Sequence, residues 1–245
     1  MSVHLVLAAT LATILCYHEV DPPRDAHVTV PRLSAAGDSA SEMLRYTVTP
    51  ENFAAQLDYL QQNGYQVIPL AQLVDALEGG GSELPPRSVV ITVDDGWLCA
   101  YTHIAPELRR RGMPFTLFVY PKIIGNGAHA VTWKQVEELA GEGVDVESHA
   151  LTHPFLTKLD TPSLARELSE SCAAIARHTG KPVRFLSYPY GDYNPAVMDA
   201  ASRAGYDGAV TTWRGPITTG TGPLELKRFL LHYDTTLEEF KTYLP

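Results

Sequence analysis

Two adjacent carboxylates, Asp94 and Asp95, stand directly after the apolar run at residues 89–93 and directly before Gly96. An Asp-Gly pair is common in turns, so the doublet alone has a structural explanation. Two carboxylates in a confined space repel each other, however, unless a cation binds one of them. The other carboxylate would then be free to act as a base, so the doublet is a candidate for acid–base chemistry at a metal ion.

Two histidines, His149 and His153, follow a second apolar segment at residues 144–148. In isolation they could be solvent-facing loop residues. The H-x3-H spacing also allows two imidazoles to bind one metal ion. Together with Asp95 they would make a three-ligand site that keeps one coordination position open for water.

The elements that must position these residues follow a regular alternation of strands and helices. Apolar β-branched runs predict strands at 13–18, 65–70, 88–93, 114–120, 144–148, 185–188, 208–212 and 226–230. Capped amphipathic segments predict helices at 49–64, 101–111, 132–140, 161–180, 194–204 and 236–244. This alternation indicates a parallel sheet covered by helices, and so many units in one domain favour a closed or nearly closed barrel. Active sites of parallel barrels lie at the carboxyl ends of the strands, so we expect both residue pairs at one rim.

The composition is that of one α/β domain that can fold without cross-links. The chain has 245 residues, 45% of them hydrophobic, which suffices to bury a core without disulfides or a structural metal. Cys16, Cys99 and Cys172 form no CxxC pair, so we interpret them as buried thiols. The formal net charge of −9 argues against nucleic acid and anionic membranes as partners. We expect a monomer without a stable membrane span.

The N-terminal segment, residues 1–12, is a candidate signal or anchor remnant, and we expect the domain to occupy residues 13–245. Residues 3–15 are mostly apolar and match a signal h-region in length. The start lacks the usual Lys or Arg, and the end of the apolar run also fits a buried strand. We expect an extracytoplasmic or secreted protein, with a cytoplasmic location as the alternative.

Three segments resemble motifs of the polysaccharide deacetylases of carbohydrate esterase family four, the family with the NodB-homology domain. TVDDG at residues 92–96 is similar to the family's TFDDG signature, and SHALTH at 148–153 is similar to its H-S/T-x-x-H element. RFLSYPY at 184–190 matches its R-x4-P-Y element. The motifs occur in the family's order across residues 13–244. The resemblance implies a distorted (β/α)7-type barrel and metal-dependent removal of acetyl groups from sugars.

The resemblance also implies roles for individual residues. Asp94 would be the general base on metal-bound water, and Arg184 would orient Asp94. The backbone N–H of Tyr190 would help to hold the oxyanion. The metal would be zinc in most cases, although other divalent transition metals suit the same ligands. Its ligands would be Asp95, His149 and His153.

The residue that protonates the leaving amine has two candidates. His232 partly matches a late L-x-x-x-H element of many family members. A subgroup that includes poly-N-acetylglucosamine deacetylases has an early Y-H element instead, and CYHEV at residues 16–20 resembles it closely. We favour His18, because it ends an apolar strand and should reach the same rim.

Several aromatic residues could form a sugar-binding platform beside this rim. Tyr190 and Trp213 are the candidates for substrate binding, and Trp213 marks the place of the family's Asp-rich fourth element, which is weak here. Trp97 and Tyr188 are further candidates, although Trp and Tyr are also common in protein cores.

The resulting hypothesis is a hydrolase that removes N-acetyl groups from an N-acetylglucosamine-containing polysaccharide or oligosaccharide, such as chitin. Metal-bound water would attack the acetamide. Alternatives are an O-acetyl esterase on acetylated xylan, a non-catalytic glycan-binding relic of the same fold, and non-haem iron chemistry at the same ligands. The spare carboxylate of Asp94 favours hydrolysis.

Overall fold

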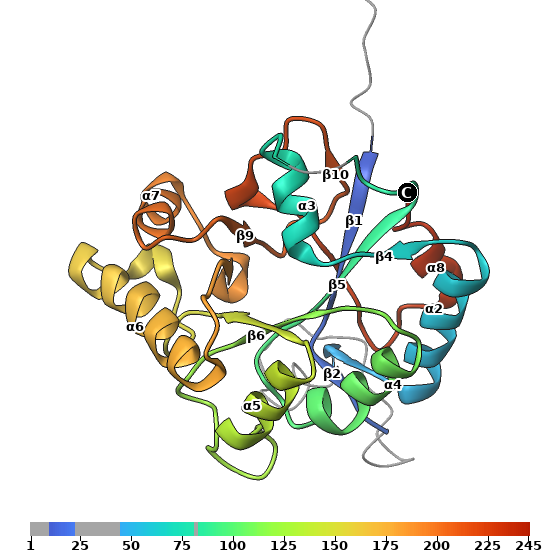
Figure 1. Ribbon diagram of the computed structural model, residues 1–245, viewed down its shortest axis with the longest axis horizontal. Coiled ribbons are helices and arrows are strands. Elements are labelled where there is room, and N and C mark those ends of the chain that lie inside the picture. The colour runs from blue at the N-terminus through green and yellow to red at the C-terminus, as the bar shows by residue number, and fades with distance from the viewer. Residues whose placement is uncertain (1–9, 23–44, 81–82) are drawn as a thin grey trace, which may run out of the picture.

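A curled sheet of mostly parallel strands forms the centre of the computed structural model, which describes residues 10–22, 45–80 and 83–245 (Figure 1). Its strands are β1 (Thr10–Tyr17), β4 (Gln66–Val67), β5 (Ser88–Val93), β6 (Thr116–Val119), β7 (Asp145–Ser148), β8 (Phe185–Ser187), β9 (Gly208–Val210), β10 (Ile217–Thr218) and β11 (Phe229–Leu230). They run in the order β10-β1-β5-β6-β7-β8-β9, with β4 beside β5 and β11 beside β1. Two short strands, β2 (Glu19–Val20) and β3 (Thr47–Val48), form a separate pair. This sheet confirms the predicted α/β barrel class.

The sheet is nearly closed by the segment at residues 226–231. On one side Leu226 forms a bridge with Val210 of β9. On the other side Phe229 of β11 pairs in parallel with Leu15 of β1. The closing segment therefore lies between the last strand of the main path and the first strand of the chain. Only short stretches of it pair regularly, which gives the barrel its distorted form.

The interior of the barrel has an apolar lower layer and a polar upper layer. Side chains two positions apart on a strand point to the same face, so the two layers come from alternate residues of the same strands. Helix α3 (Leu70–Leu77) packs against the lower layer near the first residue of β9. The lower layer contains Ile14, Val90, Phe118, Phe185, Val210 and Leu226. The upper layer contains Cys16, Thr92, Ser187 and Arg228, all fully buried.

The other helices cover the outer face of the sheet (Figure 1), and their ends follow local sequence signals. Thr132 forms a capping box at the start of α5. Asp160 caps α6, and Gly180 in the left-handed conformation ends it. The helix predicted at 101–111 begins with a π-helical turn, Ala100–Ile104, and continues as α4. These helices are α2 (Pro50–Gln62), α4 (Ala105–Arg110), α5 (Trp133–Gly141), α6 (Thr161–Thr179), α7 (Pro195–Arg203) and α8 (Leu237–Lys241).

The segment at residues 65–70, predicted as one strand, has a different structure. Only β4 is extended, and Leu70 begins helix α3. Pro69 stands at the N-cap without a side-chain capping bond, so the usual sequence signal for a helix start is missing. Leu70 and Leu73 are buried in the barrel, which explains the apolar run that resembled a strand.

Strand β1 includes the last three residues of the N-terminal segment predicted at 1–12. It begins at Thr10, and Ala12 is fully buried and pairs with Ser88 of β5. Residues 10–12 are thus part of the sheet, whereas residues 1–9 lie outside the described residues. Within the ranges given above, no helix has the length and apolar character needed to cross a membrane.

A buried carboxyl group, Glu147, links β7 to the start of β8. Its Oε2 accepts hydrogen bonds from the backbone N–H groups of Arg184 and Phe185, each at 2.8 Å. Burial, reinforced by the neighbouring charge of Asp145, raises the pKa of Glu147 to about 9. The group is therefore protonated near neutral pH in the folded protein and ionised in the unfolded chain.

We predict that Glu147→Gln removes a loss of stability at alkaline pH. Because the unfolded chain binds fewer protons than the folded protein, the free energy of unfolding falls as pH rises. The fall is up to about 1.4 kcal/mol per pH unit between the pKa of Glu147 in the unfolded chain and that in the folded protein. A glutamine keeps the accepting oxygen and cannot ionise. Urea unfolding should show that the wild type loses free energy of unfolding between about pH 6 and about pH 8.5 and that Glu147→Gln loses less. Equal slopes for the two proteins would contradict the prediction.

Candidate active site

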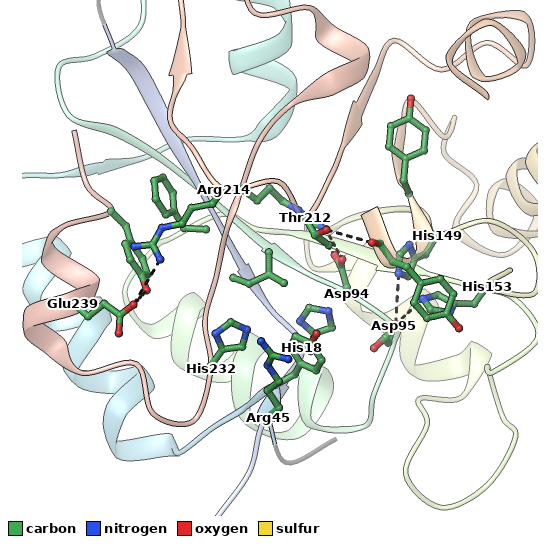
Figure 2. A pocket seen from close by; sticks show the side chains of 17 residues that line it. His18, Arg45, Asp94, Asp95, His149, His153, Thr212, Arg214, His232 and Glu239 are labelled. Atoms are coloured by element: carbon green, nitrogen blue, oxygen red, sulfur yellow. Dashed lines mark hydrogen bonds and ion pairs between the residues drawn. The ribbon is translucent and has the colours of Figure 1, made fainter. Parts of the chain in front are cut away.

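A cavity of about 450 Å³ opens at the carboxyl ends of the barrel strands (Figure 2). Its floor is the polar upper layer of the barrel, and its walls come from the segments that follow several strands. The rim predicted from the strand pattern therefore carries a concave site. The histidine, arginine and acidic residues that line it are His18, Arg45, Asp94, Asp95, His149, His153, Arg214, Arg228, His232 and Glu239.

The carboxylate of Asp94 is held by a buried arginine, Arg228. Arg228 Nη1 donates to Asp94 Oδ1 at 2.8 Å, and Nη2 donates to Oδ2 at 2.7 Å. The hydroxyl of Ser187 donates to the same Oδ2 at 2.9 Å. Burial alone would raise the pKa of Asp94, but the charge and hydrogen bonds of Arg228 hold it well below its usual range. Asp94 is therefore an ionised carboxylate at neutral pH.

The expectation that Arg184 orients Asp94 is corrected by the structure. Arg184 Nε donates to Asp207 at 2.6 Å, and its Nη2 donates to Asp75 at 3.0 Å. The reason is its place on the strand, because Arg184 precedes β8 and so lies at the amino end of the barrel. Arg228 takes the expected contact instead, and its only sequence signal is a Lys-Arg pair between apolar residues of the closing segment.

The three predicted metal ligands converge beside Asp94. Asp95 Oδ1 lies 3.5 Å from His149 Nε2 and 3.7 Å from His153 Nε2, and one ligand atom of each residue lies within 4.8 Å of the others. The other oxygen of Asp95 accepts from the indole N–H of Trp97 at 3.0 Å. His149 Nδ1 is 2.6 Å from the carbonyl oxygen of Ser187. These outer contacts leave Asp95 Oδ1 and His149 Nε2 facing a common point.

The electrostatic setting suits a cation at that point. Burial lowers the pKa of His149 to about 3 and lowers that of His153, so both rings are neutral, as metal ligands must be. Burial also raises the pKa of Asp95, and a bound cation would favour its ionised form. Two imidazole nitrogens and one carboxylate oxygen form the donor set of a divalent transition-metal site with open positions. The described residues therefore fit a metal ion.

Both candidate proton donors line the cavity. His18 and His232 both contact Tyr46, with ring centroids 4.8 and 5.4 Å from its ring. His18 is the one near the carboxylates, because a ring nitrogen of His18 lies within 4.8 Å of an Asp94 oxygen. His232 lies at the end of the cavity that Arg45 and Arg214 also line (Figure 2). The structure places both histidines at the predicted rim.

The loop after β8 presents Tyr190 to the cavity. Tyr190 has a left-handed φ of 60°, its side chain is 54% exposed, and its ring stacks on Phe155 with centroids 4.0 Å apart. Gly191 follows, also with positive φ, and a Cβ there would lie 2.0 Å from Thr212 Oγ1. Only glycine fits this contact, which fixes the direction of Tyr190. Its backbone N–H donates to none of the described groups, so it is available to a ligand.

The remaining aromatic residues have different surroundings. Trp213 is 61% exposed and lies 5.8 Å from the ring of Tyr193, outside the cavity lining but next to Thr212, which belongs to it. Tyr188 borders the cavity but is fully buried, so it offers no exposed ring face to a sugar. Phe155, which no sequence motif singled out, is an exposed ring stacked on Tyr190 at this edge of the site.

The fold and the site define an α/β barrel with a metal-ligand triad and an ionised carboxylate at its carboxyl rim. The family model for polysaccharide deacetylases matches residues 81–209. YxkH of Bacillus subtilis, assigned to the polysaccharide deacetylases, is 31% identical over 199 residues, which cover 80% of this chain and 70% of YxkH. The chain therefore belongs to the polysaccharide deacetylase family.

Two further similarities extend over nearly the whole chain. The poly-beta-1,6-N-acetyl-D-glucosamine N-deacetylase of Staphylococcus epidermidis is 25% identical over 236 residues, which cover 91% of this chain and 80% of the relative. The deacetylase PplD of Streptococcus pyogenes has the same fold, with a TM-score of 0.81 at 24% identity, covering 98% of this chain and 100% of PplD. The relatives of this chain thus include a protein named as the N-deacetylase of a polysaccharide.

We predict that Arg228→Gln and Arg184→Gln differ sharply in stability. Arg228→Gln leaves the Asp94 carboxylate buried without its charged partner, which should cost about 3–5 kcal/mol of unfolding free energy. Arg184→Gln removes partly exposed ion pairs and should cost less than about 1 kcal/mol. Urea unfolding of both variants measures the difference. Similar losses of unfolding free energy would show that the buried Asp94–Arg228 pair does not stabilise the fold more than the partly exposed pairs of Arg184.

Proposed function

We propose that this protein removes acetyl groups from the acetamides of an N-acetylglucosamine glycan and that Zn²⁺ serves the reaction. The observation that carries the proposal is the placement of an ionised Asp94 beside a three-ligand group in one cavity. A binding protein would have no need for this carboxylate, whose burial is costly. The named substrate of the Staphylococcus epidermidis relative supports the choice of glycan.

The residues that would hold the zinc ion are Asp95, His149 and His153, through the atoms that face one another. When bound, zinc would supply a water of lowered pKa and would polarise the acetamide carbonyl. The Trp97 and Ser187 contacts orient Asp95 and His149 before the ion arrives. The chain thus provides a preorganised ligand set with positions left for water and substrate.

Asp94 is suited to accept the proton of the attacking water. Arg228 keeps it ionised, so it can accept a proton across the whole neutral pH range. The same charge makes Asp94 a weak base, so proton transfer to it needs an acidified water. Tyr190 also lines the cavity, and its backbone N–H is available to donate to the oxyanion that would form from the carbonyl.

The leaving amine needs a proton, and we propose His18 as its donor. His18 lies next to Asp94 at the same rim, whereas His232 belongs to neither group of metal-ligating side chains at this rim. A donor near the base is within reach of the amide nitrogen when the carbonyl carbon faces the water.

The proposed function predicts metal-dependent acetate release. Purified protein with one equivalent of Zn²⁺ should release acetate from chito-oligosaccharides or from a β-1,6-linked N-acetylglucosamine oligomer, and a chelator should abolish the release until zinc is restored. Asp94→Asn should lose at least about 100-fold in kcat. Asp207→Asn, the same change at a surface partner of Arg184, is the matched control and should keep its activity. Release from acetylated xylan alone, or full activity of Asp94→Asn, would overturn the proposal.

The assignment of His18 predicts a dependence on the leaving group. His18→Ala should lose about 100-fold in the hydrolysis of the N-acetylated oligomer, because the amine must be protonated as it leaves. The same variant should keep most of its activity on p-nitrophenyl acetate, whose phenolate leaves without a proton. His232→Ala should retain both activities within about tenfold. A loss of amide hydrolysis confined to His232→Ala would assign the proton donor to His232 instead.

A further inference from the structure

A second group of side chains that could hold a metal ion lies beside the first, and two of its members, His18 and Asp94, line the cavity. The Sγ of Cys16, a ring nitrogen of His18 and a carboxylate oxygen of Asp94 lie within 4.8 Å of one another. None of the three belongs to the ligand group described above. Asp94 and Asp95, adjacent in sequence, therefore face two different clusters of ligand atoms.

The geometry of this second group suits a tetrahedral ion. Cys16 Sγ lies 3.9 Å from His18 Nδ1. An ion bonded to sulfur at about 2.3 Å and to nitrogen at about 2.0 Å holds the two atoms about 3.5 Å apart, so only a small adjustment is needed. Asp94 Oδ1 accepts only the hydrogen bond from Arg228 Nη1 among the described residues, whereas Oδ2 accepts two. Oδ1 therefore has lone-pair capacity left for an ion.

We propose that Cys16, His18 and Asp94 form a second binding site, which takes a thiophilic divalent ion such as Cd²⁺ or excess Zn²⁺ and inhibits the enzyme. A thiolate, an imidazole and a carboxylate select zinc and cadmium over magnesium, calcium or manganese, which prefer oxygen ligands. On binding, the sulfur–metal bond replaces the S–H bond of Cys16, and the proton goes to solvent. No oxidation is involved.

The charge balance and the access route fit this proposal. The buried guanidinium of Arg228 opposes a second cation, but the thiolate formed on binding adds a negative charge that offsets it. Cys16 is fully buried and Asp94 is 1% exposed, whereas His18 is half-buried and lines the cavity. An ion would therefore reach the sulfur from the cavity, past the imidazole. Once bound, it lies in a setting with little competing water.

The ion would inhibit the enzyme because it binds two of the proposed catalytic residues. It would take up the lone pairs of Asp94 and His18, the proposed proton acceptor and proton donor, and leave the first ligand group intact. This consequence rests on the proposed function, whereas the binding itself does not. The two can therefore be tested separately.

The test titrates Cd²⁺ into protein that already holds one equivalent of Zn²⁺. We expect the ultraviolet thiolate-to-cadmium charge-transfer band to saturate at one added equivalent, with the zinc retained after desalting by elemental analysis. Cys16→Ser and Cys16→Ala should lose the band, while the control variants Cys99→Ser and Cys172→Ser should keep it. Acetate release by the wild type should fall at least tenfold over the same equivalent, and excess Mn²⁺ should not have this effect.

Each protein's activity is normalised to its own value before cadmium is added, so an effect of Cys16 on folding or on basal activity does not confuse the comparison. Loss of inhibition in Cys16→Ser together with loss of the band supports the proposal. A band that persists in both Cys16 variants, or no band in the wild type, overturns it. A Cys16-dependent band in a protein without deacetylase activity would keep the metal site and reject the proposed function.

Discussion

The buried pair of Arg228 and Asp94 is the interaction on which the active rim depends. Arg228 comes from the segment that closes the barrel, and Asp94 follows strand β5. Their hydrogen bonds therefore join the two elements that flank β1. Further bonds from Arg228 to Thr92 and Ser187 extend this link to the polar upper layer. Removing two charges from water is costly, and the complete set of partners is what makes the arrangement tolerable.

The same pair separates the functions of two neighbouring carboxylates. Arg228 lowers the pKa of Asp94, whereas burial raises the pKa of Asp95, which has no such partner among the described residues. Opposite environments for adjacent titratable groups are how enzymes assign distinct functions to like residues. Asp94 is stable as an anion without any ligand, while Asp95 gains from a cation held by His149 and His153. The doublet thus works as a base and a ligand because the barrel surrounds its two members differently.

The sequence predicted those parts of the site that follow the ends of predicted strands. Asp94, Asp95, His149 and His18 come directly after strands of a parallel barrel, so strand direction alone brings them to one rim. Arg184 does not reach this rim, because it precedes its strand and so lies at the opposite end of the barrel. Arg228 could not be placed, because only the fold shows that residues 226–231 close the barrel with this side chain inward. Helix α3 was not predicted because its short apolar run packs against the lower layer of the barrel, and short buried strands and helices look alike in sequence.

The topology also places the two candidate proton donors, His18 and His232, at the same part of the rim. His18 follows β1, and His232 comes two residues after β11, which pairs with β1, so the two rings are neighbours. Burial lowers the pKa of both. The carboxylates of Asp95 and Asp94 oppose this effect at His18, and those of Asp234 and Glu239 oppose it at His232. A general acid must carry its proton before the amine leaves. The negative charge of the two carboxylates therefore favours the protonated form of His18.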